Sequence, residues 1–426
     1  MYRYAIEDLS KWKRKPNRKP LVIEGARQVG KTWLAKEFGA IAYGETVYVN
    51  FESNPQMTKL FTSDPQAERL IIGLEIYAGH KLAPENTLLI FDEAQEAPGV
   101  LSSLRVFAES APQYHIICTS SLVGDALRGA AFFPAESVEL MRLYPLSFQE
   151  FLAATGRKHL ADRLSRRDYS VITAAKSAYI EALGQYCFVG GMPEAVQRFA
   201  AAKDFNEARE AQMHILSAYG QELSRRAPHD VVPKIRLVLN AIPQQLAKDN
   251  KKFIYGLVRK GMRGSELETA IQWLADNGLV HRISRVCEPE KPLKTKADKA
   301  FKLFLLDVGL LGCMMGLRQR VLLDGNAVLT GFNGALTQQY VMQQLAPAEL
   351  YYYTNARGAG EVELIIETGE DIIPVEVKAE INLQAKSLKT YREKFRPKRA
   401  VRVSSADYRE EDGLTDMPLY AVENIT

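Results

Sequence analysis

The sequence is poor in cysteine and has no apolar run long enough to cross a membrane. Its 426 residues include four cysteines. These form no Cys-x-x-Cys pair and have no histidine at a metal-ligand spacing, so neither a disulfide framework nor a zinc site is indicated. The most apolar stretch, residues 301–317, contains Lys302 and Asp307 and falls short of a membrane span. The basic N-terminal segment lacks the apolar core of a signal peptide. We therefore expect a cytoplasmic protein with reduced thiols and no membrane contact.

The net charge is also small. Fifty-five lysines and arginines stand against 51 acidic residues, so the formal charge is 55 − 51 = +4, too little by itself to indicate a nucleic-acid partner. The apolar content of 46% and the charged content of 25% are those of an ordinary globular protein. At roughly 150 residues per domain, the length predicts about three domains.

Short apolar runs alternate with helical patterns over the first 150 residues. The expected strands are residues 21–24, 46–50, 88–92, 115–119 and 137–143. Such alternation is typical of βαβ units around a parallel sheet. Helical spacing then dominates residues 150–246, and short strands return from about residue 320. The fold class that we expect is therefore α/β.

One glycine-rich segment matches the phosphate-binding pattern GxxxxGK[ST] without a mismatch, and it stands between an apolar strand and a helical pattern. Its residues, all predicted to bind nucleotide, are Gly25, Ala26, Arg27, Gln28, Val29, Gly30, Lys31 and Thr32. In such a loop, backbone amides surround the phosphates, Lys31 reaches the β- and γ-phosphates, and Thr32 offers a hydroxyl to Mg²⁺. Arg27 is expected to point outward. The alternative is a chance glycine-rich turn.

Two further strand ends carry polar residues suited to nucleotide chemistry. The strand 88–92 ends in Asp92 and Glu93, which would hold Mg²⁺ and polarise the attacking water, respectively. The strand 115–119 leads into Thr119 and Ser120, where a side chain could sense the γ-phosphate. The simpler interpretations are a solvated acidic turn and an ordinary strand-end turn. Together with Lys31, however, these residues favour ATP and Mg²⁺ as cofactors and Lys31 and Glu93 as catalytic residues.

An arginine acting in trans cannot be assigned from the sequence. Arg128 and Arg142 lie where ring-forming ATPases often place such residues, but each is better explained as a surface charge. An oligomer is compatible with the sequence, and its size stays open.

Seven runs give the chain a resemblance to a widespread prokaryotic family of AAA-superfamily ATP-binding proteins with a C-terminal domain of unknown function. The runs are residues 25–32, 91–95, 144–151, 190–196, 301–304, 307–311 and 374–378. The family resembles the STAND-like branch of P-loop ATPases, in which a Gly-x-Pro turn of a helical lid contacts the nucleotide. Gly191 and Pro193 match that turn here, although glycine and proline would also make a plain turn.

The resemblance also implies an order of domains. It places an ATPase core at residues 1–150, a helical lid at 151–230, a winged-helix unit at 231–290 and a C-terminal domain at 300–426. The last domain is similar to the PD-(D/E)xK restriction-endonuclease fold.

Three residues carry the similarity to that nuclease core. Glu363 and Glu376 would be metal ligands, and Lys378, two positions on, would share their face and orient the water. The sequence departs from the pattern at Gln338, where a glutamate is usual and an amide is the weaker Mg²⁺ ligand, and at Glu363, where aspartate is usual. The alternative is a degenerate nuclease fold kept for binding or packing.

A basic segment follows this motif. Eight cations stand against one acid, with Tyr391 and Phe395 between them: Lys386, Lys389, Arg392, Lys394, Arg396, Lys398, Arg399 and Arg402. Such a segment could contact DNA, as could the winged helix, or it is a solvated helix face. A second basic cluster, residues 11–19, is interpreted as a solubilising arm.

We therefore predict an ATP-binding and ATP-hydrolysing molecular switch whose nucleotide state positions the nuclease-like domain. The alternatives are an ATP-regulated, Mg²⁺-dependent nuclease and a non-catalytic DNA-binding protein.

Overall fold

The computed structural model describes the chain except for residues 64–65, 122–132, 320–333, 370, 379–385 and 426. The described chain divides into two compact units. The first contains residues 2–144 and 276–278, and the second contains Met1 and residues 145–275 and 279–426. In the described part, no helix is long and apolar enough to span a membrane.

The first unit is built on a five-stranded parallel sheet with the strand order β2-β3-β4-β1-β5. Its strands are β1 Leu21–Glu24, β2 Glu45–Asn50, β3 Thr87–Asp92, β4 His115–Ser120 and β5 Glu139–Arg142. The strands expected from the apolar runs are thus confirmed within two residues at their ends. The order places β1, which leads into the glycine-rich loop, beside β4 and one strand away from β3.

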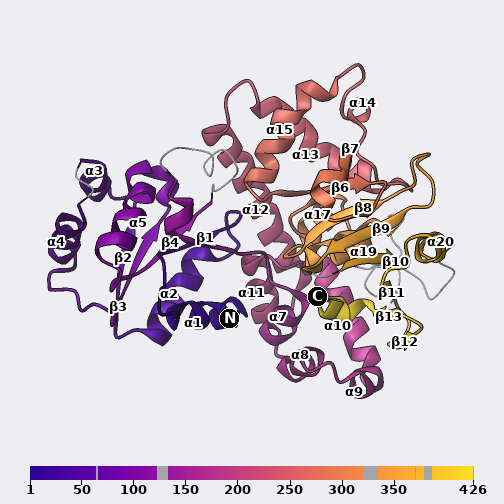
Figure 1. Ribbon diagram of the computed structural model, residues 1–426, viewed down its shortest axis with the longest axis horizontal. Helices are drawn as coiled ribbons and strands as arrows, with labels where there is room; N and C mark the ends of the chain where they lie inside the picture. Colours follow the sequence, from indigo (N-terminus) through magenta and orange to yellow (C-terminus); the bar gives the residue numbers. More distant parts are fainter. Residues whose placement is uncertain (64–65, 122–132, 320–333, 370, 379–385, 426) are drawn as a thin grey trace. The chain divides into compact units, whose positions relative to one another are not determined.

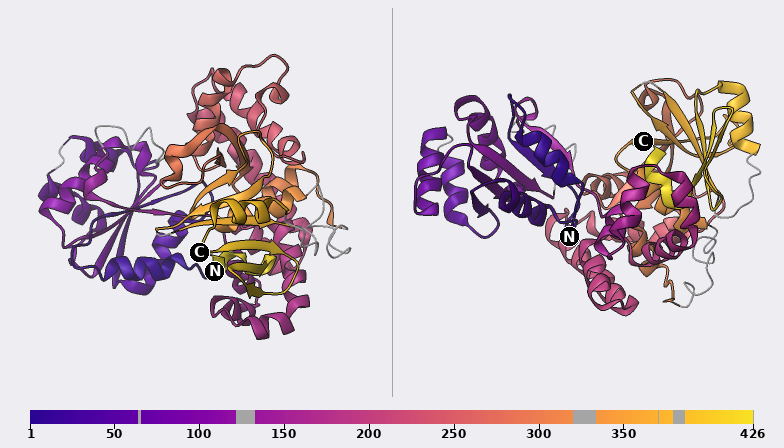
Figure 2. Two further views of the ribbon diagram at one scale, coloured as in Figure 1. Left: turned by 45° about the vertical axis from the view of Figure 1, so that its right-hand side comes forward. Right: turned by 90° about the horizontal axis from the view of Figure 1, so that it is seen from below.

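Helices cover both faces of this sheet (Figures 1 and 2). One face is packed by α3 Pro55–Ser63, α4 Ala67–Ala78 and α5 Pro98–Ser110, whose apolar residues form a core with Leu89 and Phe91 of β3. The other face is covered by α2 Lys31–Ala42 and α1 Ala5–Lys13. Because both faces are covered, all six residues of β3 are buried, as expected for a parallel strand.

The N-terminal basic cluster is not a solubilising arm, and this prediction was wrong. Leu9 and Trp12 of α1 are buried, and the cations nearby are used in packing. The Lys13 ammonium lies 4.0 Å from the ring centroid of Tyr43, and the Arg18 guanidinium lies 5.7 Å from that of Trp12. Helix α1 ends at Lys13, so the basic residues 11–19 form its last turn and the segment that connects it to β1.

The second unit begins with a helical region. Its helices are α7 Phe148–Ala154, α8 Lys158–Ser165, α9 Tyr169–Ala174, α10 Lys176–Val189, α11 Pro193–Ala202 and α12 Phe205–Arg226. A capping box starts α7, in which the Ser147 hydroxyl accepts from the Glu150 amide and the Glu150 side chain accepts from the Ser147 amide. The cap satisfies two amides that a helix start otherwise leaves without partners.

Three helices and a hairpin come next along the chain: α13 Val232–Leu246, α14 Tyr255–Val258, α15 Gly264–Asp276, β6 Val280–Val286 and β7 Ala297–Leu305, with the short α16 Leu293–Lys296 inside the hairpin. The order of elements is compatible with the expected winged-helix unit, which stays a prediction. The hairpin is not separate from the C-terminal strands, because β6 also pairs in parallel with β8 Glu349–Tyr353.

An eight-stranded mixed sheet of order β12-β13-β11-β10-β9-β8-β6-β7 organises the rest of this unit. Its remaining strands are β9 Val362–Glu367, β10 Ile372–Val377, β11 Ala400–Ser404, β12 Arg409–Glu411 and β13 Leu414–Pro418. The helical segments are α17 Val308–Met314, α19 Ala335–Leu345, α20 Lys386–Phe395 and the 3₁₀ segment η5 Leu419–Ile425. Helix α19 has ten buried residues among its eleven, so it is a core helix.

Candidate nucleotide-binding site

The phosphate-binding loop joins β1 to α2, as the pattern predicts. Its backbone needs glycine at Gly25, where φ is +153° and an added Cβ would lie 2.4 Å from the Leu143 carbonyl oxygen. Gly30 precedes α2 with φ +96°, a conformation that glycine adopts without strain. The loop therefore ends at the N-terminus of a twelve-residue helix, where backbone amides and the helix dipole favour an anion.

Lys31 is held inside this loop. Its side chain is buried, and its ammonium donates to the carbonyl oxygens of Gly25, at 2.9 Å, and Ala26, at 2.8 Å. These contacts keep the charge at the centre of the loop, where a phosphate would replace the carbonyls as its partner.

The structure brings Thr32, Asp92 and Thr119 together from three elements. The Thr32 hydroxyl donates to Asp92 Oδ1 at 2.9 Å, and the Thr119 hydroxyl donates to the same oxygen. Because β3 and β4 are parallel neighbours, their carboxyl ends meet at one edge of the sheet, next to the start of α2. A hydroxyl and a carboxylate are oxygen ligands of the kind that Mg²⁺ prefers, so this pair fits the expected metal ion.

Two residues of this cluster were missed in the sequence. Tyr48 donates to Asp92 Oδ2 at 2.6 Å, and Asn50 donates to it at 3.2 Å. Burial, and then the hydrogen bond to Asp92, raises the pKa of Tyr48 to about 12. Both residues lie toward the end of β2, which pairs with β3. The sequence does not show this pairing, so it did not indicate that they contact Asp92.

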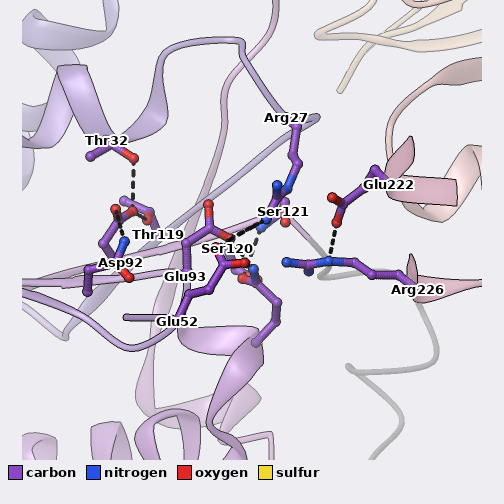
Figure 3. Close-up of polar contacts among 12 residues, drawn as sticks. Arg27, Thr32, Glu52, Asp92, Glu93, Thr119, Ser120, Ser121, Glu222 and Arg226 are labelled. Carbon is purple, nitrogen blue, oxygen red and sulfur yellow. Dashed lines mark hydrogen bonds and ion pairs between the residues drawn. The ribbon is translucent and has the colours of Figure 1, made fainter. Parts of the chain in front are cut away.

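Arg27 does not point outward, contrary to the prediction. Its guanidinium Nη2 lies 3.4 Å from Glu93 Oε2 and 3.6 Å from Glu52 Oε2 (Figure 3). The next residue of the loop, Gln28, takes a left-handed φ of +65°. The attraction of two carboxylates holds the Arg27 guanidinium in place.

Glu93 itself is fixed at an unusual backbone position. Its φ is +54°, in the left-handed region that non-glycine residues rarely occupy. The Glu93 Oε2 atom also accepts a hydrogen bond from the side-chain nitrogen of Gln95. The side-chain oxygen of Gln95 in turn accepts from the Ser120 hydroxyl at 3.0 Å and from the backbone amide of Ser121 at 3.2 Å. Gln95, also missed in the sequence, thus connects the predicted catalytic glutamate to the strand end predicted to sense phosphate.

The two arginines considered for a role in trans have different outcomes. Arg128 lies outside the described residues. Arg142 ends β5, with its guanidinium 5.7 Å from the ring centroid of Tyr144, a distance typical of a cation–π contact.

The predicted lid residues Gly191 and Pro193 lie in the second unit. The Gly191 amide donates to Asp307 Oδ2 at 2.6 Å, its carbonyl accepts from the Leu146 amide, and an added Cβ would lie 2.2 Å from the Leu146 oxygen. Pro193 starts α11. Packing thus explains why residue 191 is glycine, and the contact with nucleotide stays a prediction.

The C-terminal motif forms a charged group in which Glu376 is buried and Glu363 and Lys378 are half-buried. The register in which Val375 faces Leu364 places Glu376 beside Glu363. Burial, and then the charge of Glu376, raises the pKa of Glu363. The Lys378 ammonium lies 2.7 Å from Glu376 Oε1, and the Val377 amide donates to Glu363 Oε2 at 3.2 Å.

Lys302 belongs to the same group and was overlooked as a functional residue. Its fully buried ammonium lies 2.6 Å from Glu361 Oε1, and its charge opposes the rise in the pKa of Glu363. In the sequence, the position of Lys302 inside the apolar run 301–317 was the feature that could have indicated its buried charge.

Among the described residues, no group of three histidine, cysteine or acidic side chains could hold a metal ion. Glu376 Oε2 and the Gln338 side-chain oxygen are buried without a hydrogen-bond partner there.

The basic segment is only partly available to a ligand. Five cations are exposed: Lys386, Lys389, Lys394, Arg396 and Lys398. Arg402 forms a two-point ion pair with Asp416, at 2.7 and 3.0 Å. Tyr391 and Phe395 pack against Tyr353, so their rings serve the core rather than stacking on bases.

Comparison with known proteins supports the first unit as a nucleotide-binding domain. Residues 17–152 match a family model described as AAA domain. Residues 180–321 and 333–422 match two domains of unknown function, DUF8612 and DUF4143. Among curated proteins, none matches the sequence.

Solved structures that match the chain include the Walker-type ATPase PABY2304 of Pyrococcus abyssi (TM-score 0.46, 17% identity, covering 72% of this chain and 95% of that one). Others are Drosophila ORC bound to DNA (TM-score 0.29, 15% identity, 74% and 95%) and the Aeropyrum pernix ORC1 protein in complex with DNA (TM-score 0.27, 13% identity, 77% and 90%).

The family match over residues 17–152, the parallel sheet and the phosphate-binding loop define the first unit as an AAA-type P-loop ATPase domain. Such a domain binds nucleotide, typically with Mg²⁺.

Proposed function

We propose that the protein is a molecular switch that binds and hydrolyses ATP and uses its nucleotide state to position a nuclease-like C-terminal domain. The observation that carries the proposal is the contact between Thr32 and Asp92, 2.9 Å long, beside the buried Lys31. These three residues supply a hydroxyl, a carboxylate and an ammonium at the helix N-terminus where a triphosphate with Mg²⁺ would bind.

Each residue has a distinct part in the proposed reaction. Backbone amides of the loop bind the phosphates, and Lys31 exchanges its carbonyl partners for phosphate oxygens. Thr32 and Asp92 would hold Mg²⁺, which neutralises charge on the phosphates when bound. Glu93 accepts a proton from the attacking water, and Thr119 and Ser120 lie on the neighbouring strand end, where they sense the γ-phosphate. For Gly191 and Pro193, the family resemblance alone supports a role in nucleotide binding.

The proposal is tested by measuring ATP binding and phosphate release with the full-length protein. Lys31→Ala should abolish both, because the loop then lacks its phosphate-binding cation. Lys59→Ala, at an exposed lysine of α3, is the matched control and should behave as wild type. Equal activity in wild type and Lys31→Ala would refute the proposal.

A second candidate function is Mg²⁺-dependent nucleic-acid cleavage by Glu363, Glu376 and Lys378. It is supported by the adjacent carboxylates of the half-buried Glu363 and the buried Glu376 and by the Lys378 contact with Glu376. Incubation of plasmid DNA with Mg²⁺ or Mn²⁺ tests it, with Glu376→Gln as the inactive variant and the exposed Glu393→Gln as the control. Cleavage that persists in Glu376→Gln would exclude this function.

A third candidate is DNA binding without cleavage, through the proposed winged helix and the exposed cations of residues 386–398. Each phosphate contact contributes about −0.9 to the slope of log K against log salt. Replacing Lys386, Lys389 and Lys394 with glutamine should therefore make the slope about 3 units less negative. A wild-type affinity that does not depend on salt would remove DNA as a partner.

A further inference from the structure

We propose that Arg27 is a positioning residue that holds Glu93 while the site lacks a γ-phosphate and transfers to the γ-phosphate when ATP binds. Glu52 competes with that phosphate for the same guanidinium. The inference rests on the proposed ATPase function and adds to it a means of distinguishing ATP from ADP.

The first support is the place of Arg27 in the loop. It lies between Gly25 and Lys31, the segment whose amides would surround the phosphates, yet its guanidinium is directed to two carboxylates (Figure 3). Its side chain is 28% exposed, and those of Glu93 and Glu52 are 18% and 35% exposed. The ion pairs are therefore partly shielded from water, although they remain within reach of a ligand.

The second support is the chemistry of exchange. A guanidinium binds phosphate oxygens in the same two-point manner as it binds carboxylates. A triphosphate brings more negative charge to the loop than either glutamate carries, so it can replace them as the partner of Arg27. ADP lacks the γ-phosphate, so Arg27 stays paired with the two carboxylates when ADP is bound.

The third support is that Glu93 keeps other contacts when Arg27 moves to the phosphate. Gln95 donates to Glu93 and accepts from Ser120 and from the Ser121 amide. Loss of Arg27 would thus leave Glu93 connected to β4, the strand whose end is predicted to sense the same phosphate. The left-handed backbone of Glu93, φ +54°, fixes the start of its side chain during this change.

Glu52 provides the selective test, because it belongs to neither the phosphate-binding loop nor the predicted catalytic residues. Its carboxylate lies 3.6 Å from Arg27 Nη2. Neutralising it removes one competitor for the guanidinium and leaves Glu93, Lys31, Thr32 and Asp92 in place.

The experiment compares the Kd of ADP with that of the non-hydrolysable ATP analogue adenylyl imidodiphosphate. It uses the full-length protein with Mg²⁺ and calorimetry. Arg27→Gln should weaken the analogue about tenfold while ADP changes little, as expected for loss of a hydrogen bond between charged groups. Arg27→Lys, which keeps the charge, should recover part of this loss. Glu52→Gln should tighten the analogue about threefold, in the range of a partly exposed ion pair, and lower the KM for ATP without changing kcat.

The matched controls are Arg105→Gln and Glu109→Gln, which break an exposed Arg–Glu pair of 2.8 Å on α5 and should change neither Kd. Thermal melting of every variant checks that it is folded. An unchanged ratio of the two Kd values in Arg27→Gln, or weaker analogue binding in Glu52→Gln, would overturn the inference while wild type still hydrolyses ATP. If wild type binds neither nucleotide, the proposed function itself fails.

Discussion

Two acidic pairs, Asp92 with Glu93 and Glu363 with Glu376, differ in the groups that surround the predicted metal ligands. Asp92 accepts from the hydroxyls of Thr32, Thr119 and Tyr48 and from the amide of Asn50. The C-terminal pair is instead close to ammonium groups, since Lys378 contacts Glu376 and the buried Lys302 acts on Glu363.

This difference has a consequence for ligand binding. Neutral donors reorient when a dication arrives, and the Thr32 hydroxyl can turn its lone pairs toward the metal. A lysine ammonium has no lone pair in its charged form and repels a dication. Asp92 is therefore surrounded by groups that can admit Mg²⁺, whereas the C-terminal carboxylates have part of their charge balanced by neighbouring ammonium groups.

The largest expected effect concerns Lys302, which balances the charge of the C-terminal carboxylates. Lys302→Ala should reduce the free energy of unfolding of the second unit by about 3 kcal/mol, because it removes a fully buried ammonium from its half-buried partner Glu361. Urea unfolding measures the loss. Lys296→Ala, which breaks an exposed pair with Glu290, should change stability by less than about 1 kcal/mol.

Lys302→Met separates charge from volume, because methionine fills much of the same space. Addition of Mg²⁺ should stabilise Lys302→Met more than wild type if the lysine takes the place of a metal charge. Equal responses of the two proteins to Mg²⁺ would contradict the comparison between the two acidic pairs.

A somewhat smaller effect is expected at the nucleotide site. Asp92→Asn should lower kcat for ATP hydrolysis about 100-fold, comparable to the loss of one preorganised electrostatic contact, because the amide is a weaker ligand for Mg²⁺. Phosphate release under saturating ATP and varied Mg²⁺ measures this change. Asp8→Asn on the exposed side of α1 should be neutral, and a neutral Asp92→Asn would show that the Thr32–Asp92 pair does not hold the metal.

The smallest effect concerns pH and a third acidic group. Burial raises the pKa of Glu423 to about 7, against hydrogen bonds from the Gln149 amide and the Ser147 side chain. A carboxyl whose pKa is raised on folding stabilises the protonated folded state, so its contribution is present at low pH and is lost as pH rises through 7. For a rise from 4.5 to 7, the loss between pH 5 and 7 is about 2 kcal/mol.

Glu423→Gln should therefore flatten the fall in stability between pH 5 and 7, as measured by urea unfolding at several pH values. Glu363 has the same direction of shift, so the slope should decrease without disappearing. Glu393→Gln, at an exposed position, should keep the wild-type slope, and a wild-type slope in Glu423→Gln would contradict the prediction.

The sequence predicted the parallel sheet and the phosphate-binding loop well, because both depend on local patterns. Apolar runs indicated β1 to β5, and the loop motif indicated Lys31 and Thr32 as ligands of the phosphates and Mg²⁺. The strand order cannot be obtained from such runs, which is why Tyr48 and Asn50 were missed as partners of Asp92.

Other differences arise from contacts distant in sequence. The direction of Arg27 depends on Glu52 and Glu93, which join it only in the folded domain. In the C-terminal region, the sequence predicted short strands from about residue 320, but β12 and β13 are too short for an apolar pattern to place them. In the basic segment, Tyr391 and Phe395 stand between cations, and this pattern does not predict that their rings pack against Tyr353.

The pairing of β6 with β8 has a practical consequence for dividing the chain. Ser284, Arg285 and Val286 pair with Tyr351, Tyr352 and Tyr353, so the strands on either side of residue 290 share one hydrogen-bonded sheet. A protein truncated to residues 300–426 would lose β6 and leave the backbone of β8 unpaired along one edge. An exposed edge of this kind promotes aggregation. Fragments intended for the study of the C-terminal carboxylates should therefore start near residue 145, where the second unit begins.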